Sequence, residues 1–310
     1  MRSTSRRQFL AQAAAAGGAL AVAPHAFAQS ADKPYDMCIA TWAGENAAVD
    51  EAQLAAKLVR EAFDAVGGMG RFVKKSDVVW LKPNIAWNRT PEQAATTNPY
   101  VVKTLIELCF DAGASKVKVG DNTCHNSRQT YAASGIAEIA RAAGADVIFI
   151  DDSRFREMQV GGEAVKRWPV YPEIVESDIV INAPIAKHHG LSTATLCMKN
   201  YMGVVGGNRG QWHQNITACL RDITAFMKPQ VSVLDAVRTL VANGPTGGDL
   251  GDVRRLNTFA VGTDVIALDA FGAELLGHTP LSIGTIRLGA ESGLGTVDYK
   301  SLALKEATVS

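Results

Sequence analysis

Polar side chains that can do chemistry recur directly after short apolar runs of this sequence. They are amines, imidazoles, carboxylates, amides and one thiol: Lys82, Asn84, Asp121, Asn122, Cys124, His125, Asp151, Asp152, Asn182, Lys187, His188, His189 and Asp235. Single polar residues at such positions are common in turns and helix caps. A cluster of Lys, His and Cys is explained less easily by capping, so the pattern predicts a polar site.

The pair Cys124-His125 has the chemistry of a metal or redox centre. A thiolate beside an imidazole can act as a nucleophile or as a soft metal ligand. Adjacent residues of a strand point to opposite faces, so both side chains serve one site only if the chain bends there. The alternative is a turn cysteine next to a solvated histidine.

Lysines supply the second kind of chemistry. Lys187 precedes two histidines, and a lysine in a cleft can bind an anion or act as a base. Lys199-Asn200 lies in the otherwise apolar stretch 196–205, where a lysine either snorkels to the surface or is paired in a pocket. The Gly-rich loop 206–210 carries Arg209, which suits a carboxylate or phosphate, although a plain loop without a ligand is the alternative. We expect Lys82, Asn84, Lys199 and Asn200 to bind a cofactor or an anionic group.

Alternating strands and helices must position these residues. Strands are predicted at 36–41, 77–81, 116–119, 146–150, 178–182, 230–234 and 257–261, and helices at 50–66, 99–112, 130–143, 216–227 and 264–276. This alternation predicts an α/β fold with a mostly parallel sheet and helices on both faces. Ligands of such sheets bind beyond the carboxyl ends of the strands, where the polar residues would meet. The pattern leaves open whether the fold is one sheet or two lobes around a cleft.

Six short motifs follow one another along the chain: Lys82-Pro83-Asn84, Gly120-Asp121, Lys187-His188, residues 197–203 (CMKNYMG), Asn243-Gly244-Pro245 and residues 264–269 (DVIALD). Together they resemble the domain of unknown function 362 family, over roughly residues 37–276. The resemblance implies the α/β fold, and it marks Lys187 and His188, so we expect His188 rather than His189 to face the site. Many members carry a bacterial ferredoxin module, whose four-cysteine run this chain lacks. The family implies no settled activity.

Three aspartates near the later strands have different expected roles. Asp264 precedes a helix and is predicted to cap it. Asp269 lies inside that helix and should pair with a lysine or face solvent. Asp235 ends a buried strand and is the one expected to reach the crevice.

Residues 1–28 read as a twin-arginine signal peptide, with residues 29–310 forming a single α/β domain. Arg6 and Arg7 stand in the sequence SRRQFL, a small apolar run follows, and Ala26-Phe27-Ala28 offers a cleavage site. The apolar run is shorter than the ~20 residues that span a bilayer. We therefore expect a periplasmic protein, exported after folding, whose mature form does not span a membrane. Folded export favours a bound cofactor.

Composition narrows the function further. Lys and Arg together number 31 and balance 31 Asp and Glu, and no basic run with interleaved aromatics is present, which argues against nucleic acid as a partner. The five cysteines include no CxxC spacing.

Three function hypotheses result. The first is a metal- or cofactor-dependent protein, redox-linked, in which Cys124, His125, His188 and Asp121 hold a metal ion or iron–sulfur-type centre and Lys187 and Cys124 are catalytic. The second is a non-catalytic protein that binds a small anionic ligand or a redox partner. The third and weakest is a hydroxy-acid isomerase resembling nickel-dependent lactate racemases.

Overall fold

One ten-stranded sheet forms the centre of the protein, as seen in a computed structural model that describes residues 34–44 and 49–310. The predicted signal peptide, residues 1–28, lies outside the described residues. The strands are β1 (Met37–Trp42), β2 (Val78–Pro83), β3 (Lys116–Val119), β4 (Asp146–Val147), β7 (Ile179–Ala183), β8 (Ile185–His189), β9 (Thr193–Thr195), β10 (Val231–Leu240), β11 (Val253–Gly262) and β12 (Leu304–Val309). Their main order is β12-β1-β11-β10-β7-β2-β3-β4, with β8 paired to β10 and β9.

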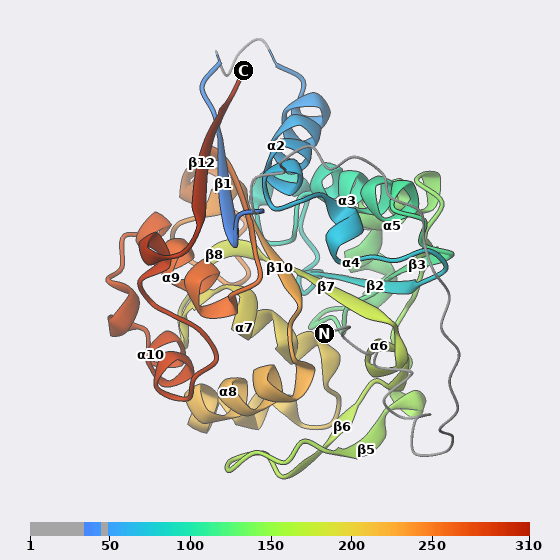
Figure 1. Ribbon diagram of the computed structural model, residues 1–310. Helices are drawn as coiled ribbons and strands as arrows, with labels where there is room; N and C mark the ends of the chain where they lie inside the picture. The colour runs from blue at the N-terminus through green and yellow to red at the C-terminus, as the bar shows by residue number, and fades with distance from the viewer. Residues whose placement is uncertain (1–33, 45–48) are drawn as a thin grey trace, which may run out of the picture.

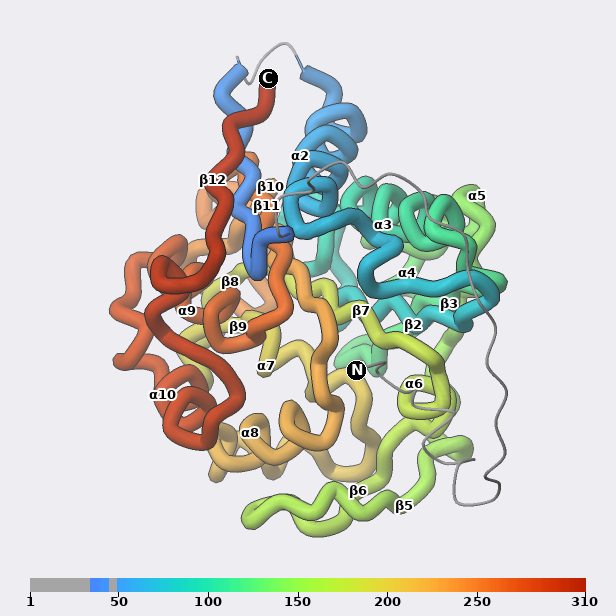
Figure 2. Tube along the Cα trace, viewed as in Figure 1, coloured from blue at the N-terminus to red at the C-terminus, as the bar shows by residue number. Residues whose placement is uncertain are grey.

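Most neighbouring strands of this sheet run parallel. The run β10-β7-β2-β3-β4 is parallel throughout, as is β12 beside β1, and Figure 2 shows β12 following β1 along its length. Antiparallel pairs are β1–β11, β10–β11 and β8–β9. The predicted mostly parallel α/β sheet is thus confirmed.

Helices cover both faces of the sheet (Figure 1). They are α2 (Glu51–Ala65), α3 (Pro99–Asp111), α4 (Ser127–Ala133), α5 (Ile136–Ala142), α6 (Pro172–Glu176), α7 (Cys197–Asn200), α8 (Ile216–Met227), α9 (Val265–Leu275) and α10 (Gly284–Glu291). One apolar core lies between the sheet and α2, α3 and α5, and a second lies between the sheet and α7 to α10. The described helices include none that is both long and apolar enough to cross a membrane.

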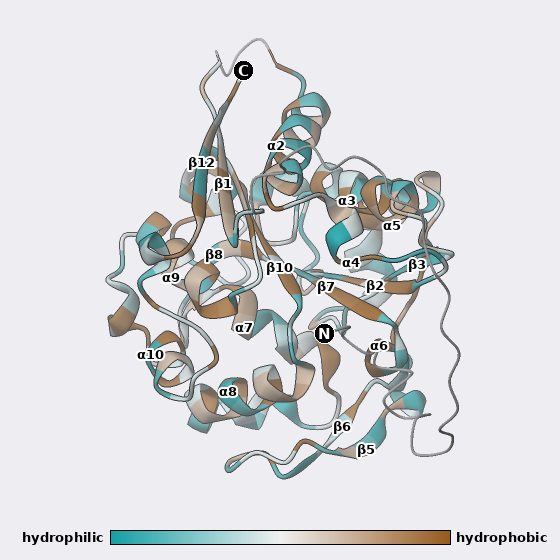
Figure 3. Cartoon of the chain, in the orientation of Figure 1, coloured by the Kyte–Doolittle hydropathy of each residue, from teal (hydrophilic) through white to brown (hydrophobic). Residues whose placement is uncertain are grey.

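The central strands are apolar on both sides because they contribute to both cores. In β2, Val79 and Leu81 belong to the first core, whereas Trp80 between them belongs to the second. Figure 3 accordingly shows β7 largely in the hydrophobic colour. Continuous apolar runs of this kind are typical of parallel strands buried on both faces.

Helix starts agree with the sequence prediction. Asn98 accepts a hydrogen bond from the Tyr100 amide at the start of α3, with Pro99 in the first helical position. Asp264 accepts from the amides of Ile266 and Ala267 at the start of α9. Both side chains satisfy amides that the helix itself leaves unpaired.

Several elements differ from the prediction. The helix expected over 130–143 is two helices, because Gly135 adopts a left-handed conformation (φ 70°) between α4 and α5. No element was predicted between the strands expected at 146–150 and 178–182, but this stretch contains α6 and a separate two-stranded hairpin, β5 (Arg156–Gln159) with β6 (Arg167–Val170). The sequence pattern also did not predict β8, β9 and β12.

Candidate functional site

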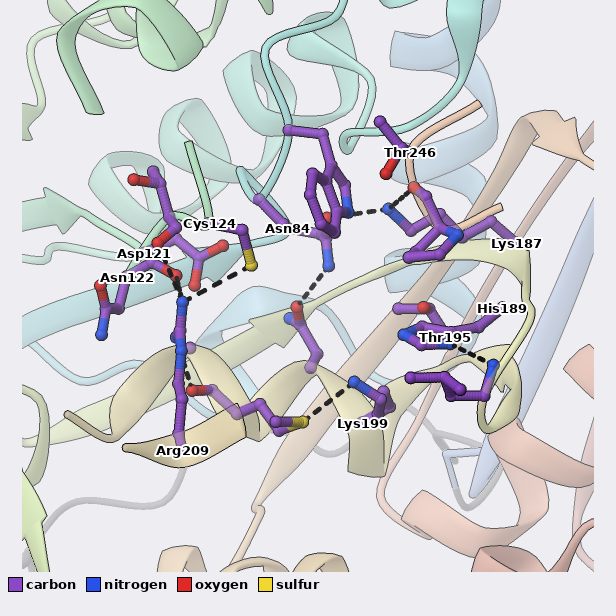
Figure 4. Close-up of a pocket in the computed structure, with 18 of the residues that line it drawn as sticks. Asn84, Asp121, Asn122, Cys124, Lys187, His189, Thr195, Lys199, Arg209 and Thr246 are labelled. Atoms are coloured by element: carbon purple, nitrogen blue, oxygen red, sulfur yellow. Dashed lines mark hydrogen bonds between the residues drawn. The ribbon is translucent and has the colours of Figure 1, made fainter. Parts of the chain in front are cut away.

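A cavity of about 840 Å³ lies beyond the carboxyl ends of β2 and β3, as the fold predicted. Its other walls are β8, α7, the short helical segment Arg209–Asn215 and the loop that follows β10. Residues lining it with groups able to do chemistry are Lys82, Asn84, Asp121, Asn122, Cys124, Lys187, His189, Thr195, Lys199, Asn200, Arg209, His213 and Thr246. Figure 4 labels most of these residues and shows that the labelled ones converge from segments far apart in the sequence.

Lys82 and Asp121 form a buried ion pair in the floor of this cavity. The Lys82 ammonium lies 2.7 Å from Asp121 Oδ1, and both side chains are almost fully excluded from solvent. Lys82 also donates to Asn200 Oδ1 and to the Pro83 carbonyl, each at 3.0 Å. Burial lowers the pKa of Lys82, although the carboxylate opposes that shift. Because one ion pair and two hydrogen bonds already engage its ammonium in the wall, Lys82 is committed to the fold of the site.

Asn200 ties α7 to the sheet. Its oxygen accepts from Lys82 and from Asn84 Nδ2, and its nitrogen donates to the Lys82 carbonyl and to Asn182 Oδ1. All the amide hydrogen-bonding groups of Asn200 are therefore engaged within the wall. This network holds the neighbouring Lys199 at the cavity.

Lys187 reaches the cavity from β8 without an acidic partner among the described residues. Its ammonium donates to the carbonyls of Ala95 (2.5 Å) and Pro245 (3.0 Å) and lies 3.4 Å from Asn84 Oδ1. Burial lowers the pKa of Lys187 to about 7. A lysine with such a pKa exists partly as the neutral amine near neutral pH, which a base or a nucleophile requires.

Lys199 and Arg209 also lack a carboxylate partner in the described part of the chain. Among residues 34–44 and 49–310, the Lys199 ammonium has only the thioether of Met202, at 2.9 Å, as a hydrogen-bond acceptor. Burial lowers its pKa to about 8, and the nearby Arg209 and Lys82 act in the same direction. Arg209 donates to the carbonyls of Met202, Asn122 and Thr123 and lies 3.7 Å from the sulfur of Cys124.

Of the two adjacent histidines of β8, His189 lines the cavity, and the expectation that His188 would do so is not met. Residues alternate between the two sides of a strand, so Lys187 and His189 of β8 share one side and His188 takes the other. The Nδ1 atom of His188 accepts a hydrogen bond from the Gly244 amide, at 3.1 Å, and thereby supports the loop after β10. The i, i+2 spacing of Lys187 and His189 was the signal that could have identified the correct histidine.

The four metal ligands expected from the sequence do not come together as a set. Asp121 is engaged with Lys82 and with the Ile85 amide, and the ring of His125 packs edge-on against Trp87. Cys124 is exposed at the cavity rim, the one exposed cysteine of the five. Within residues 34–44 and 49–310, no group of three or more His, Cys, Asp or Glu side chains could hold a metal ion.

Two aspartates have structural roles that the sequence pattern did not predict. Asp269 is buried and accepts hydrogen bonds from the amides of Cys197 and Met198, so it neither pairs with a lysine nor faces solvent. Asp235 is also buried and accepts from the Asn98 amide instead of lining the cavity. Burial raises the pKa of each to about 7. Asp269 thus connects α9 to α7, and Asp235 connects β10 to the start of α3.

Sequence comparisons agree with the motifs in the cavity wall. A thylakoid-associated protein of Synechocystis sp. is 29% identical over 245 residues, covering 76% of this chain and 74% of that protein. Residues 79–274, which run from β2 into α9 and include all the residues that line the cavity, match the family described as domain of unknown function (DUF362). The chain therefore belongs to the DUF362 family.

Proposed function

We propose that the protein binds a small organic anion in this cavity, contacted by Lys199 and Arg209 and attracted also by the charge of Lys187, whose ammonium already donates to Ala95, Pro245 and Asn84. One observation carries the proposal: three basic side chains from three segments line one cavity, and the lining carboxylate, Asp121, is already paired with Lys82. An anion would supply the missing negative charge.

The physical reason is the cost of buried positive charge. Removing an ammonium from water is unfavourable unless an opposite charge is close, and the lowered pKa values of Lys187 and Lys199 record that cost. An anion that contacts them would favour their charged forms and raise both pKa values. Arg209 adds a guanidinium that matches a carboxylate or phosphate in geometry.

The metal- or cofactor-dependent redox hypothesis stays a separate prediction. Its ligand set would have to differ from Cys124, His125, His188 and Asp121 as the described residues place them. Anion binding needs no thiol, so Cys124→Ser separates the two hypotheses. We further propose a periplasmic location, which rests on residues 1–28 alone.

Calorimetric titration tests the proposal. Phosphate, acetate, succinate, citrate and 2-oxoglutarate would be titrated into the protein at pH 7 and low salt. Lys199→Met replaces the ammonium by an uncharged side chain of similar length. It should weaken the affinity for the tightest-binding anion about 10- to 100-fold, the range expected for a charge-assisted hydrogen bond. Lys199→Arg should retain most of the affinity.

Two further variants complete the design. Lys166→Met removes an exposed charge outside the cavity and should leave affinity unchanged. Cys124→Ser should also bind normally. The proposal is wrong if no anion of the panel binds, or if Lys199→Met and Lys166→Met bind equally well. A metal assay on the same wild-type sample tests the redox hypothesis independently.

A further inference from the structure

The imidazole of His189 is held in one protonation form by its own turn. Its Nδ1 atom accepts hydrogen bonds from the amides of Leu191 (3.2 Å) and Ser192 (3.4 Å). A nitrogen that accepts cannot carry a proton, so the proton of the neutral ring must be on Nε2. The turn between β8 and β9 thus makes Nε2 a hydrogen-bond donor.

The surroundings keep this ring neutral. His189 is buried, and burial together with the charges of Lys199 and Lys187 lowers its pKa to about 3. The ring of His213 stacks on it with centroids 5.8 Å apart and would add to the repulsion if it were charged. His189 is therefore a neutral donor surrounded by cations.

The donor edge of His189 faces the cavity. Figure 4 shows the ring with one nitrogen toward its own turn and the opposite edge toward the space in front of Lys199 and Asn84. Among the described residues, no protein acceptor is recorded for Nε2. The cavity wall thus presents an uncharged donor next to cations that have no carboxylate partner among the described residues.

We propose that the anion bound here carries a carbonyl or hydroxyl oxygen beside its carboxylate, and that His189 Nε2–H donates a hydrogen bond to that oxygen. This inference rests on the proposed function and names the substrate class as 2-oxo or 2-hydroxy acids. Cations neutralise the carboxylate, but they do not distinguish one carboxylate from another. A neutral donor adds that distinction. When the bound acid has no oxygen beside its carboxylate, the donor gives up its hydrogen bond to water and gains no partner in the ligand.

Matched ligand pairs of equal charge provide the test. Pyruvate would be compared with propionate, and 2-oxoglutarate with glutarate, by calorimetric titration. We expect the wild-type protein to prefer the oxo acid of at least one pair about tenfold, which is the effect of one hydrogen bond that leaves no unpaired donor.

Two substitutions of His189 separate its roles. The amide oxygen of His189→Asn can occupy the place of Nδ1 and support the turn, but nothing reaches the place of Nε2. His189→Gln reaches the place of Nε2 but leaves the turn amides without their acceptor. We expect His189→Asn to lose the preference for the oxo acid while keeping its affinity for the plain acid. His189→Gln should keep part of the preference even if it is less stable.

The inference is overturned if His189→Asn still prefers the oxo acids, or if the wild-type protein binds both members of each pair equally. In the latter case binding that is sensitive to Lys199→Met would leave the proposed function intact, so the two failures are distinguishable. Imidazole nitrogen shifts measured by NMR test the protonation form without any ligand. His189 should show the Nε2–H form and stay neutral down to pH 5, and an Nδ1–H form or a titration near pH 6.5 would refute the argument.

Discussion

Replacing Asp121 by Asn should destabilise the protein strongly, because it removes the counterion of a buried lysine. Asp121 Oδ1 faces the Lys82 ammonium at 2.7 Å, and Oδ2 accepts from the Ile85 amide at 2.6 Å. Asparagine has a single oxygen, so its NH₂ group must face one of these two donors. The variant therefore loses the charge and gains a donor–donor contact.

The size of the loss follows from burial. Lys82 and Asp121 are 0% and 2% exposed, so water cannot replace the lost partner. Breaking such a pair from one side costs about 3–5 kcal/mol. At about 2–4 °C per kcal/mol for a domain of this size, the melting temperature should fall by roughly 6–20 °C.

The loss should depend on pH in a defined direction. Burial already lowers the pKa of Lys82, and removing Asp121 removes the main influence that raises it. In the unfolded chain a lysine keeps its proton until about pH 10.4. The unfolded variant therefore binds more protons than the folded one, so its stability rises with pH, by at most about 1.4 kcal/mol per pH unit. The deficit relative to the wild-type protein should narrow from pH 7 to pH 9.

Urea unfolding followed by circular dichroism at pH 6, 7, 8 and 9 measures these effects. Asp146→Asn is the matched control, since Asp146 pairs with Lys116 at 3.1 Å but both side chains are about half exposed. That substitution should cost about 0–1 kcal/mol. Adding Lys82→Met to Asp121→Asn should recover part of the stability. If Asp121→Asn costs no more than Asp146→Asn at pH 7, the ion pair does not support the fold in the way argued.

Three other predictions concern packing, binding and export. Gly203→Ala should destabilise the protein by about 1–3 kcal/mol or more, because a Cβ there would lie 1.8 Å from Asp121 Oδ1 and 2.6 Å from Lys82 Nζ. Gly210→Ala, whose Cβ would come no closer than 3.6 Å to its neighbours, should melt like the wild-type protein, and equal melting of both variants would contradict the packing argument. Anion affinity should fall as pH rises from 6 to 9, since Lys187 and Lys199 lose their protons near pH 7 and 8 and only the charged forms attract an anion. Lys199→Arg should show a shallower decline in the same titrations, and affinity that does not change with pH would argue against the lysines as the binding groups. Changing both Arg6 and Arg7 to Lys should leave the precursor in the cytoplasm, as followed by fractionation and immunoblotting, whereas Arg2→Lys should be exported normally. Normal export of the double variant would exclude the twin-arginine route.

Local chemistry explains which parts of the fold were predictable. The caps Asn98 and Asp264 bind amides two or three residues away, so their roles follow from neighbouring sequence. Asp269 binds the Cys197 amide, 72 residues away, and Asp235 binds the Asn98 amide, 137 residues away, in addition to the nearby Val237 amide. No local pattern indicates such distant contacts. For that reason the predictions that Asp269 would pair with a lysine or face solvent and that Asp235 would reach the crevice were wrong.

The choice between His188 and His189 shows the same limit within the site. Strand β8 begins directly after Pro184, and the pairing of β8 with β9 and β10 sets which of its side chains enter the cavity. Those pairing partners could not be read from the apolar pattern, since β8 and β9 were not predicted as strands. Alternation counted from Lys187 points to His189, but it applies only once residues 185–189 are known to form a strand.

The sequence by itself determined the mostly parallel sheet, the edge at which the cavity lies and the identity of the lysines that line it, because hydrophobic periodicity and strand-end chemistry are local properties. The tertiary structure alone decided which charges are paired. In the folded protein Lys82 forms an ion pair with Asp121. Among the described residues, no carboxylate pairs with Lys187, Lys199 or Arg209. The tertiary structure also turns the donor edge of His189 into the cavity. Pairing and burial depend on distances between segments far apart in the chain, and only the packed fold sets those distances.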